Sequence, residues 1–188
     1  PADAAQARIP SDFLRVVVPW LDVGASERSA RPAPRAPQAA GEVVVDLAGS
    51  RERPLHVERP WGRAFGILTE PAAPSADLVA VMFNAGVVRR TGPNRLWVGA
   101  ARHRAARGVR SVRLDLAGIG DASGDTGAYE DVGQMYTPEL VEEAVAVLAE
   151  LRARGFGERF LLLGLCSGAY LAFHAALDTP GVVGAIML

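Results

Sequence analysis

A single cysteine stands between two glycines near the end of the chain, in the sequence Gly164-Leu165-Cys166-Ser167-Gly168. An apolar run precedes this stretch and an alanine-rich helical pattern follows it, which predicts a strand, a sharp turn and a helix. Residues without a Cβ fit most easily where a strand and a helix press against such a turn. The pattern therefore predicts a nucleophile elbow that raises the Cys166 thiol above a sheet, at the positive end of a helix.

Two alternatives to this interpretation of Cys166 come from the same residues. The first is that Cys166 is buried and unreactive, since cysteine is among the most buried residue types. Ser167 is a second candidate nucleophile, but Cys166 is the middle residue between Gly164 and Gly168. We therefore prefer Cys166 as the nucleophile and expect the Ser167 hydroxyl to form a hydrogen bond at the start of the helix.

Length and composition set limits on the protein class. The chain has 188 residues, 49% of them hydrophobic, and a net charge of −1. This length is enough for a domain with its own core, and the balanced charge argues against nucleic-acid binding. No apolar run reaches the roughly 18 residues that span a bilayer. One cysteine forms no internal disulfide, so we expect a reducing, cytoplasmic environment, and no Cys/His spacing predicts a metal or a cofactor.

The chain divides into two parts by composition. Residues 1–42 contain a short apolar segment followed by a stretch rich in Ala, Pro, Arg and Ser that has no apolar period. We interpret this part as an arm or linker, with the tail of an upstream domain as the alternative. Residues 43–188 are expected to form an α/β domain.

Apolar runs alternate with helical patterns through this domain, which predicts a mostly parallel sheet with helices on both faces. Two runs joined by a Pro/Gly turn, at 54–58 and 63–68, predict an antiparallel hairpin at one edge, and 42–47 a short first strand. The last strand is expected to be an uncovered apolar edge. The predicted parallel strands cover 77–83, 109–116, 160–164 and 182–188, and the predicted helices cover 93–107, 138–154 and 167–177.

Three motifs, taken in order, resemble the α/β-hydrolase superfamily. They are similar to its oxyanion loop, its D-x-x-G-x-G-x-S stretch and its nucleophile elbow, and here they read Phe83–Val87, Asp115–Ser123 and Gly164–Gly168. More narrowly, three segments resemble the exosortase-associated or serine-aminopeptidase-like hydrolases, several of which carry Cys in the elbow: Gly92–Arg95, Arg113–Asp115 and Gly164–Cys166. The resemblance covers about residues 54–188, and the ordered combination is more specific than any one motif.

This resemblance implies an acyl hydrolase or acyltransferase that acts on an ester or thioester of a small molecule, free or linked to a carrier or CoA. The backbone N–H groups of Val87 and Ser167 would serve as oxyanion donors. Asn84 and the basic group Arg89, Arg90 and Arg95 are candidates for binding a substrate phosphate or carboxylate, with a solvated rim as the alternative. Asp115 and Asp121 are expected to be structural.

The resemblance also implies a catalytic acid and a histidine that follow the nucleophile along the chain. Only 22 residues follow Cys166, and His174, eight residues into the helix, lies about 12 Å of helical rise away. Neither His56 nor His103 has a better position. We therefore expect a second segment to complete the site; the alternatives are a non-catalytic binding or assembly module and a redox-sensitive thiol.

Overall fold

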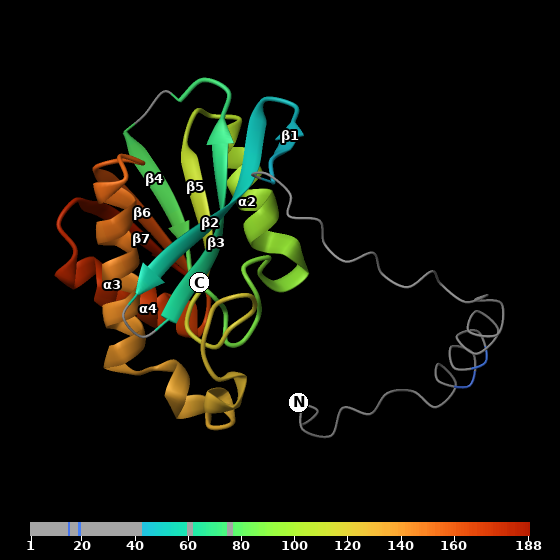
Figure 1. Cartoon of the computed structure of the whole chain (residues 1–188), viewed down its shortest axis with the longest axis vertical. Helices are drawn as coiled ribbons and strands as arrows, with labels where there is room; N and C mark the ends of the chain where they lie inside the picture. Colours follow the sequence, from blue (N-terminus) through green and yellow to red (C-terminus); the bar gives the residue numbers. More distant parts are fainter. Residues whose placement is uncertain (1–14, 16–18, 20–42, 60–61, 75–76) are drawn as a thin grey trace, which may run out of the picture. The chain divides into compact units, whose positions relative to one another are not determined.

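The computed structural model describes residues 15, 19, 43–59, 62–74 and 77–188. The predicted arm at 1–42 lies outside the described residues apart from the first two of these positions. Residues 43–188 form a seven-stranded sheet with helices packed on both of its faces (Figure 1). The α/β fold predicted from the alternation of apolar runs and helical patterns is confirmed.

The sheet combines an antiparallel half with a parallel half, in the order β1-β2-β3-β5-β4-β6-β7. The first three strands pair antiparallel, and β3 also pairs antiparallel with β5. The remaining pairs are parallel. The predicted hairpin is therefore present, and its strands are longer than the sequence pattern indicated. The strands are β1 (Val45–Leu47), β2 (Ser50–Arg59), β3 (Gly62–Pro71), β4 (Leu78–Met82), β5 (Arg110–Asp115), β6 (Arg159–Gly164) and β7 (Val182–Met187).

Three α-helices cover the sheet. One face packs against α2 (Leu96–Ala105), and the other carries α3 (Pro138–Ala153) and α4 (Ser167–Asp178), as Figure 1 shows. Parallel strands buried between two helical layers explain the continuous apolar runs of β4 and β6. None of the described helices is long and apolar enough to cross a membrane.

The helix predicted from Pro93 begins later than expected. Pro93–Arg95 forms a 3-10 turn in which Asn94 and Arg95 have φ values of 49° and 61°, so the α-helix starts only at Leu96. Buried Trp97 explains the break, because its indole N–H donates to the Phe83 carbonyl at 3.0 Å and its backbone N–H to that of Thr91 at 3.1 Å. The backbone reaches Trp97 through Asn94 and Arg95, whose positive φ values lie in the left-handed region.

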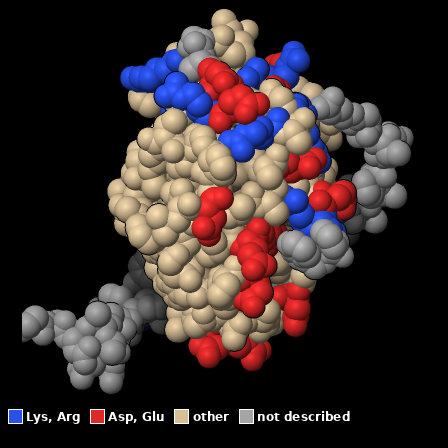
Figure 2. Space-filling view, turned by 90° about the vertical axis from the view of Figure 1, so that its left-hand side faces the viewer, with Lys and Arg blue, Asp and Glu red and all other residues tan. Residues whose placement is uncertain are grey.

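Strand β7 forms one edge of the described sheet, as predicted. It pairs with β6 on one side, and the exposed fraction is 50% for Val183 and 52% for Met187. On the neighbouring helix α4, Phe173 and Leu177 are also exposed. Figure 2 shows a broad uncharged area on this side of the molecule, next to separate acidic and basic groups.

The long loop between β5 and α3 is ordered by its own polar side chains. It contains two 3-10 turns, η3 (Thr126–Tyr129) and η4 (Val132–Met135), and the carboxylates of Asp125 and Asp131 accept the N–H groups of Gly127 and Gly133. At its start, the Ala117 carbonyl accepts a hydrogen bond from the Tyr129 hydroxyl. Burial, followed by the nearby Glu143 charge, raises the pKa of Tyr129 to about 12. The loop is therefore held together by hydrogen bonds among its own residues.

Glu143 fastens the same loop to α3 from a buried position. Both of its carboxylate oxygens lie 3.0–3.1 Å from the Ala117 nitrogen, and only 3% of the residue is exposed. Burial raises the pKa of this carboxyl above its ordinary value, although the Ala117 N–H and the Arg59 charge oppose the shift. The folded protein therefore holds the Glu143 proton more tightly than the unfolded chain does.

This raised pKa predicts how stability depends on pH. The stability that protonated Glu143 contributes is fully present at pH values below the ordinary carboxyl pKa. It is lost as the pH rises through the raised pKa. Glu143→Gln accepts the same N–H without a charge, so its free energy of unfolding should exceed that of the parent by on the order of 1 kcal/mol near pH 8. Urea unfolding from about pH 5 to pH 8 measures the difference, which should widen with pH. Glu142→Gln, at an exposed neighbouring position, is the control; equal pH slopes for Glu143→Gln and the parent would contradict the prediction.

Candidate active site

Cys166 occupies the turn between β6 and α4 in a strained backbone conformation. Its φ of 56° and ψ of −122° lie in a region that side-chain-bearing residues rarely adopt. The thiol is exposed, and α4 begins at the next residue, so the sulfur stands at the positive end of the helix. The strand, turn and helix predicted around Cys166 are present.

Two backbone contacts explain the elbow glycines. A Cβ on Gly164 would lie 1.9 Å from the Gly168 carbonyl oxygen, and a Cβ on Gly168 would lie 2.3 Å from that of Asn84. Neither distance is compatible with a side chain, because the neighbouring atoms are backbone and have little freedom to move. The glycines therefore allow β6, α4 and the end of β4 to meet at one point.

The candidate oxyanion loop follows β4 and is held beside this turn. The Phe83 N–H donates to the Leu163 carbonyl at 2.9 Å, and the Val88 N–H donates to the Ala85 carbonyl at 3.1 Å. Val87 lies at the exposed tip of this turn, and no described residue accepts a hydrogen bond from its N–H. Ser167 is the first residue of α4, where helical N–H groups lack an intrahelical partner.

The hydroxyl of Ser167 has a different role from the one predicted. It does not cap α4; instead it accepts a hydrogen bond from the Gly86 N–H at 2.8 Å, and the residue is 3% exposed. The helix begins directly at the strained turn, which points this hydroxyl toward the loop after β4. Ser167 therefore joins the oxyanion loop to the elbow.

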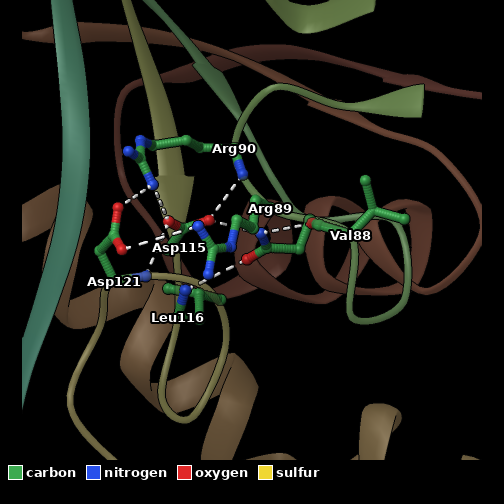
Figure 3. Close-up of polar contacts among 7 residues, drawn as sticks. Val88, Arg89, Arg90, Asp115, Leu116 and Asp121 are labelled. Carbon is green, nitrogen blue, oxygen red and sulfur yellow. Dashed lines mark hydrogen bonds and ion pairs between the residues drawn. The ribbon is translucent and has the colours of Figure 1, made fainter. Parts of the chain in front are cut away.

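Asp115, at the end of β5, organises the polar groups beneath the loop (Figure 3). Its carboxylate is fully buried and accepts hydrogen bonds from the backbone N–H and the guanidinium of Arg90, both at 2.6 Å. It also accepts from the Asn84 amide at 3.1 Å and from the Asp121 N–H at 3.2 Å. A Cβ on Gly120 would lie 2.3 Å from this carboxylate, which explains the second glycine of the Asp115–Ser123 stretch.

Two of the predicted substrate-binding residues are engaged inside the protein instead. The Asn84 amide is buried, donates to the Val88 carbonyl and Asp115, and accepts from the Leu116 N–H. The Arg90 guanidinium pairs with Asp115 and Asp121 and lies 4.4 Å above the Phe65 ring. Sequence alone does not reveal these contacts, because the partners come from three different segments.

Arg89 differs from Arg90 although the two are adjacent. Its side chain is 64% exposed, and its nearest carboxylate oxygen, on Asp121, is 3.9 Å away. Figure 3 shows both arginines around the Asp115 carboxylate. Arg89, together with exposed Arg95 at the start of α2, remains a candidate for contact with a substrate anion.

A small pocket lies between the elbow and the β5–α3 loop. Its lining is mainly apolar, and Tyr129 and Ile119 also border an open depression next to Val87. Tyr129 and Met135 of the β5–α3 loop form part of this lining. The lining residues of the small pocket are Asn84, Gly86, Leu116, Ile119, Tyr129, Met135, Leu140, Ser167 and Leu171.

None of the three histidines forms a base for Cys166. His56 and His103 are exposed on β2 and α2, and the His174 ring packs 4.3 Å from that of Tyr170. Tyr136 lies beside the thiol instead, with its hydroxyl oxygen 3.8 Å from the sulfur. Within the described ranges, no three His, Cys, Asp or Glu residues come together as metal ligands.

Comparison with known proteins places this arrangement in a fold class. No protein-family model and no curated protein matches the sequence. Among solved structures, a cold-adapted esterase from an Arctic intertidal metagenomic library matches with a TM-score of 0.63 at 16% identity, over 77% of this chain and 62% of its own. Acetyl xylan esterase 1 from Thermoanaerobacterium gives 0.60 at 12% identity, over 77% and 50%. An alpha-beta serine hydrolase homologue from Coxiella burnetii gives 0.55 at 20%, over 72% and 61%.

These likenesses establish the fold. Residues 43–188 have the α/β-hydrolase fold, as the three sequence motifs indicated. The chain spans less than two thirds of the length of each of these three proteins. The narrower resemblance to exosortase-associated hydrolases stays a prediction.

Substitution of two glycines, one in the elbow and one on α2, should have opposite effects on stability. Gly164→Ala forces a methyl group onto the Gly168 carbonyl and should lower the free energy of unfolding by about 3 kcal/mol or more. Gly99→Ala, on an exposed face of α2 with nothing within 4 Å of the new Cβ, should raise it by about 0.5–1 kcal/mol. Chemical denaturation measures both values, and a Gly164→Ala protein as stable as the parent would show that this close contact is wrong.

The two adjacent arginines provide a second matched pair. Arg90→Ala leaves buried Asp115 without its cation and should cost about 2–3 kcal/mol of stability. Arg89→Ala removes an exposed side chain and should change stability by less than about 0.5 kcal/mol. Thermal and urea unfolding compare the two variants. If they were equally stable, Arg90 would not be the structural cation of this site.

Proposed function

We propose that this chain carries the nucleophile of a cysteine-dependent acyl hydrolase or acyltransferase that acts on esters or thioesters. The observation that carries the proposal is the exposed Cys166 thiol, held at φ 56° at the start of α4 beside the oxyanion loop. Strain of this kind persists where the surrounding structure enforces it, and it concentrates at functional sites. Support also comes from the fold, since its neighbours include esterases.

The proposed reaction has two balanced steps. First, the Cys166 thiol loses its proton to solvent and the thiolate attacks the carbonyl carbon, so that a C–S bond forms and the carbonyl electron pair moves to oxygen. The Val87 and Ser167 N–H groups would stabilise this oxyanion. The oxyanion then collapses and expels the leaving group with its electron pair, which gives acyl-Cys166. In the second step water, or an acceptor alcohol, thiol or amine, attacks the acyl carbon and loses its proton to solvent. The C–S bond then breaks, and its electron pair returns to the Cys166 sulfur as the thiolate.

A thioester suits this arrangement better than an alkyl ester. A departing thiolate leaves without a proton donor, because an ordinary thiol has a pKa of only about 8.5. An alkoxide is far more basic and needs a general acid. Because no histidine lies beside Cys166 in the described chain, we propose a thioester of a carrier or of CoA as the substrate class. A second segment that completes the site would then serve the second step, in which the acceptor needs a base.

The same absence of an imidazole beside Cys166 favours one other candidate function. The fold would then serve as a non-catalytic module that binds an acyl group or an assembly partner. Such a module needs the pocket beside Ser167 and Met135 but not the thiol. The two candidates differ in whether a covalent bond to Cys166 forms.

Acyl transfer to the thiol tests the proposal directly. The full chain is incubated with acetyl-CoA and with an alkyl acetate ester, and intact mass spectrometry detects any acetyl adduct. We expect an adduct from the thioester that hydroxylamine removes, with at least about tenfold less from the ester, in line with the poorer leaving group.

Two variants control this experiment. Cys166→Ala should give no adduct, and Cys166→Ser should give far less, because a serine hydroxyl is a weak nucleophile without a neighbouring base. An unmodified parent protein would contradict the enzyme proposal. If acetyl-CoA nevertheless bound equally to the parent and to Cys166→Ala, the binding module would be the better description.

A further inference from the structure

Tyr136 lies at the candidate nucleophile although it belongs to a distant part of the sequence. Its hydroxyl oxygen is 3.8 Å from the Cys166 sulfur, which is within hydrogen-bonding range for this larger atom. Thirty residues separate the two positions. Among the described side chains, no other forms a hydrogen bond with the thiol.

The position of Tyr136 is fixed by contacts on its backbone and on its ring. Its N–H donates to the Gly133 carbonyl at 3.0 Å, and the Gly133 N–H in turn donates to the Asp131 carboxylate at 2.8 Å. Helix α3 begins two residues later, so the backbone continues into a packed element. The ring meets the Tyr170 ring edge to face, with centroids 5.4 Å apart and an interplanar angle of 78°. Such pairs contribute beyond the area that they bury.

Tyr170 joins this support to the elbow itself. It lies four residues after Cys166, which is about one turn of α4. The helix that positions the thiol therefore also positions the ring against which Tyr136 rests. Tyr136 itself belongs to the loop before α3 and is 39% exposed.

From this geometry we infer that Tyr136 is a catalytic residue that donates its hydroxyl hydrogen to the Cys166 sulfur and stabilises the thiolate before attack. The inference rests on the proposed acyl-transfer function. The hydrogen bond with Cys166, followed by its charge, raises the pKa of Tyr136, which keeps the phenol protonated and makes it a donor rather than a base. The thiol proton therefore goes to solvent, and Tyr136 keeps its own.

The donor has a defined effect on the reaction. A hydrogen bond from Tyr136 stabilises the form of Cys166 that attacks, since the thiolate and not the thiol is the nucleophile. When the C–S bond forms, the sulfur loses its negative charge and becomes a weak acceptor. The interaction is therefore strongest with the ionised thiol, and its loss should appear as a change in the pH dependence of thiol reactivity.

The test measures Cys166 alkylation by iodoacetamide in the full chain as a function of pH. Tyr136→Phe keeps the ring and its contact with Tyr170 and removes one oxygen. We expect its alkylation to be about three- to tenfold slower near pH 7, the range that an ordinary hydrogen bond contributes, and its pH profile to differ from that of the parent. Tyr170→Phe, which also loses one phenol hydroxyl, should match the parent.

Thermal melting and alkylation in denaturant show whether a slower rate comes from misfolding. All variants should react equally when unfolded, because the tyrosine then lies far from the thiol. The inference fails if folded Tyr136→Phe has the rate and the pH profile of the parent, or if Tyr170→Phe is slowed equally. This result is separate from that of the acetyl-CoA experiment: a shifted profile without an acetyl adduct would retain the Tyr136–Cys166 interaction and overturn acyl transfer.

Discussion

Backbone packs directly against backbone where β4, β6 and α4 meet, and the positions of the other site groups depend on this contact. A Cβ added to Gly164 would overlap the Gly168 carbonyl, and a Cβ added to Gly168 would overlap the Asn84 carbonyl. The turn between the two glycines has few available conformations, and the one it adopts gives Cys166 a positive φ. The energetic cost of that strain is met by the buried strands and helices on either side, in which β6 and α4 contribute Leu162, Leu171 and Ala175 to the core.

A second constraint is the buried carboxylate of Asp115. A charge removed from water is tolerated only when it is paired and hydrogen-bonded, and Asp115 meets this condition with donors from three residues, Asn84, Arg90 and Asp121. The loop after β4 therefore has a fixed path between Asp115 below and Ser167 beside it. Residues of a type that often binds anions, Asn84 and Arg90, serve here to hold the loop. The tip of the loop at Val87 is left exposed.

Local patterns predicted the parts of this structure that local physics determines. The buried strands, the helices and the elbow at Cys166 follow from apolar period and from glycine spacing, which act over short stretches. Such patterns do not predict contacts between residues that are far apart in the sequence. The loop that carries Tyr136 has no apolar period, so nothing in its sequence indicated that its hydroxyl reaches Cys166. The Ser167 hydroxyl was assigned to its own helix for the same reason, and the left-handed residues Asn94 and Arg95 depend on where Trp97 is anchored.

The end of the edge strand is joined directly to the backbone of the candidate nucleophile. The Cys166 N–H donates to the Leu188 carbonyl at 3.1 Å, and the Leu188 N–H donates to the Gly164 carbonyl at 3.0 Å. Edge strands open more readily than the centre of a sheet, and protection of an amide from exchange with solvent reflects the opening of its weakest partner. The amide of Cys166 should therefore exchange at the rate at which β7 frays, although β6 and α4 on either side are well buried. Any chain that lies along β7 would slow this fraying and make the nucleophile more rigid without touching it.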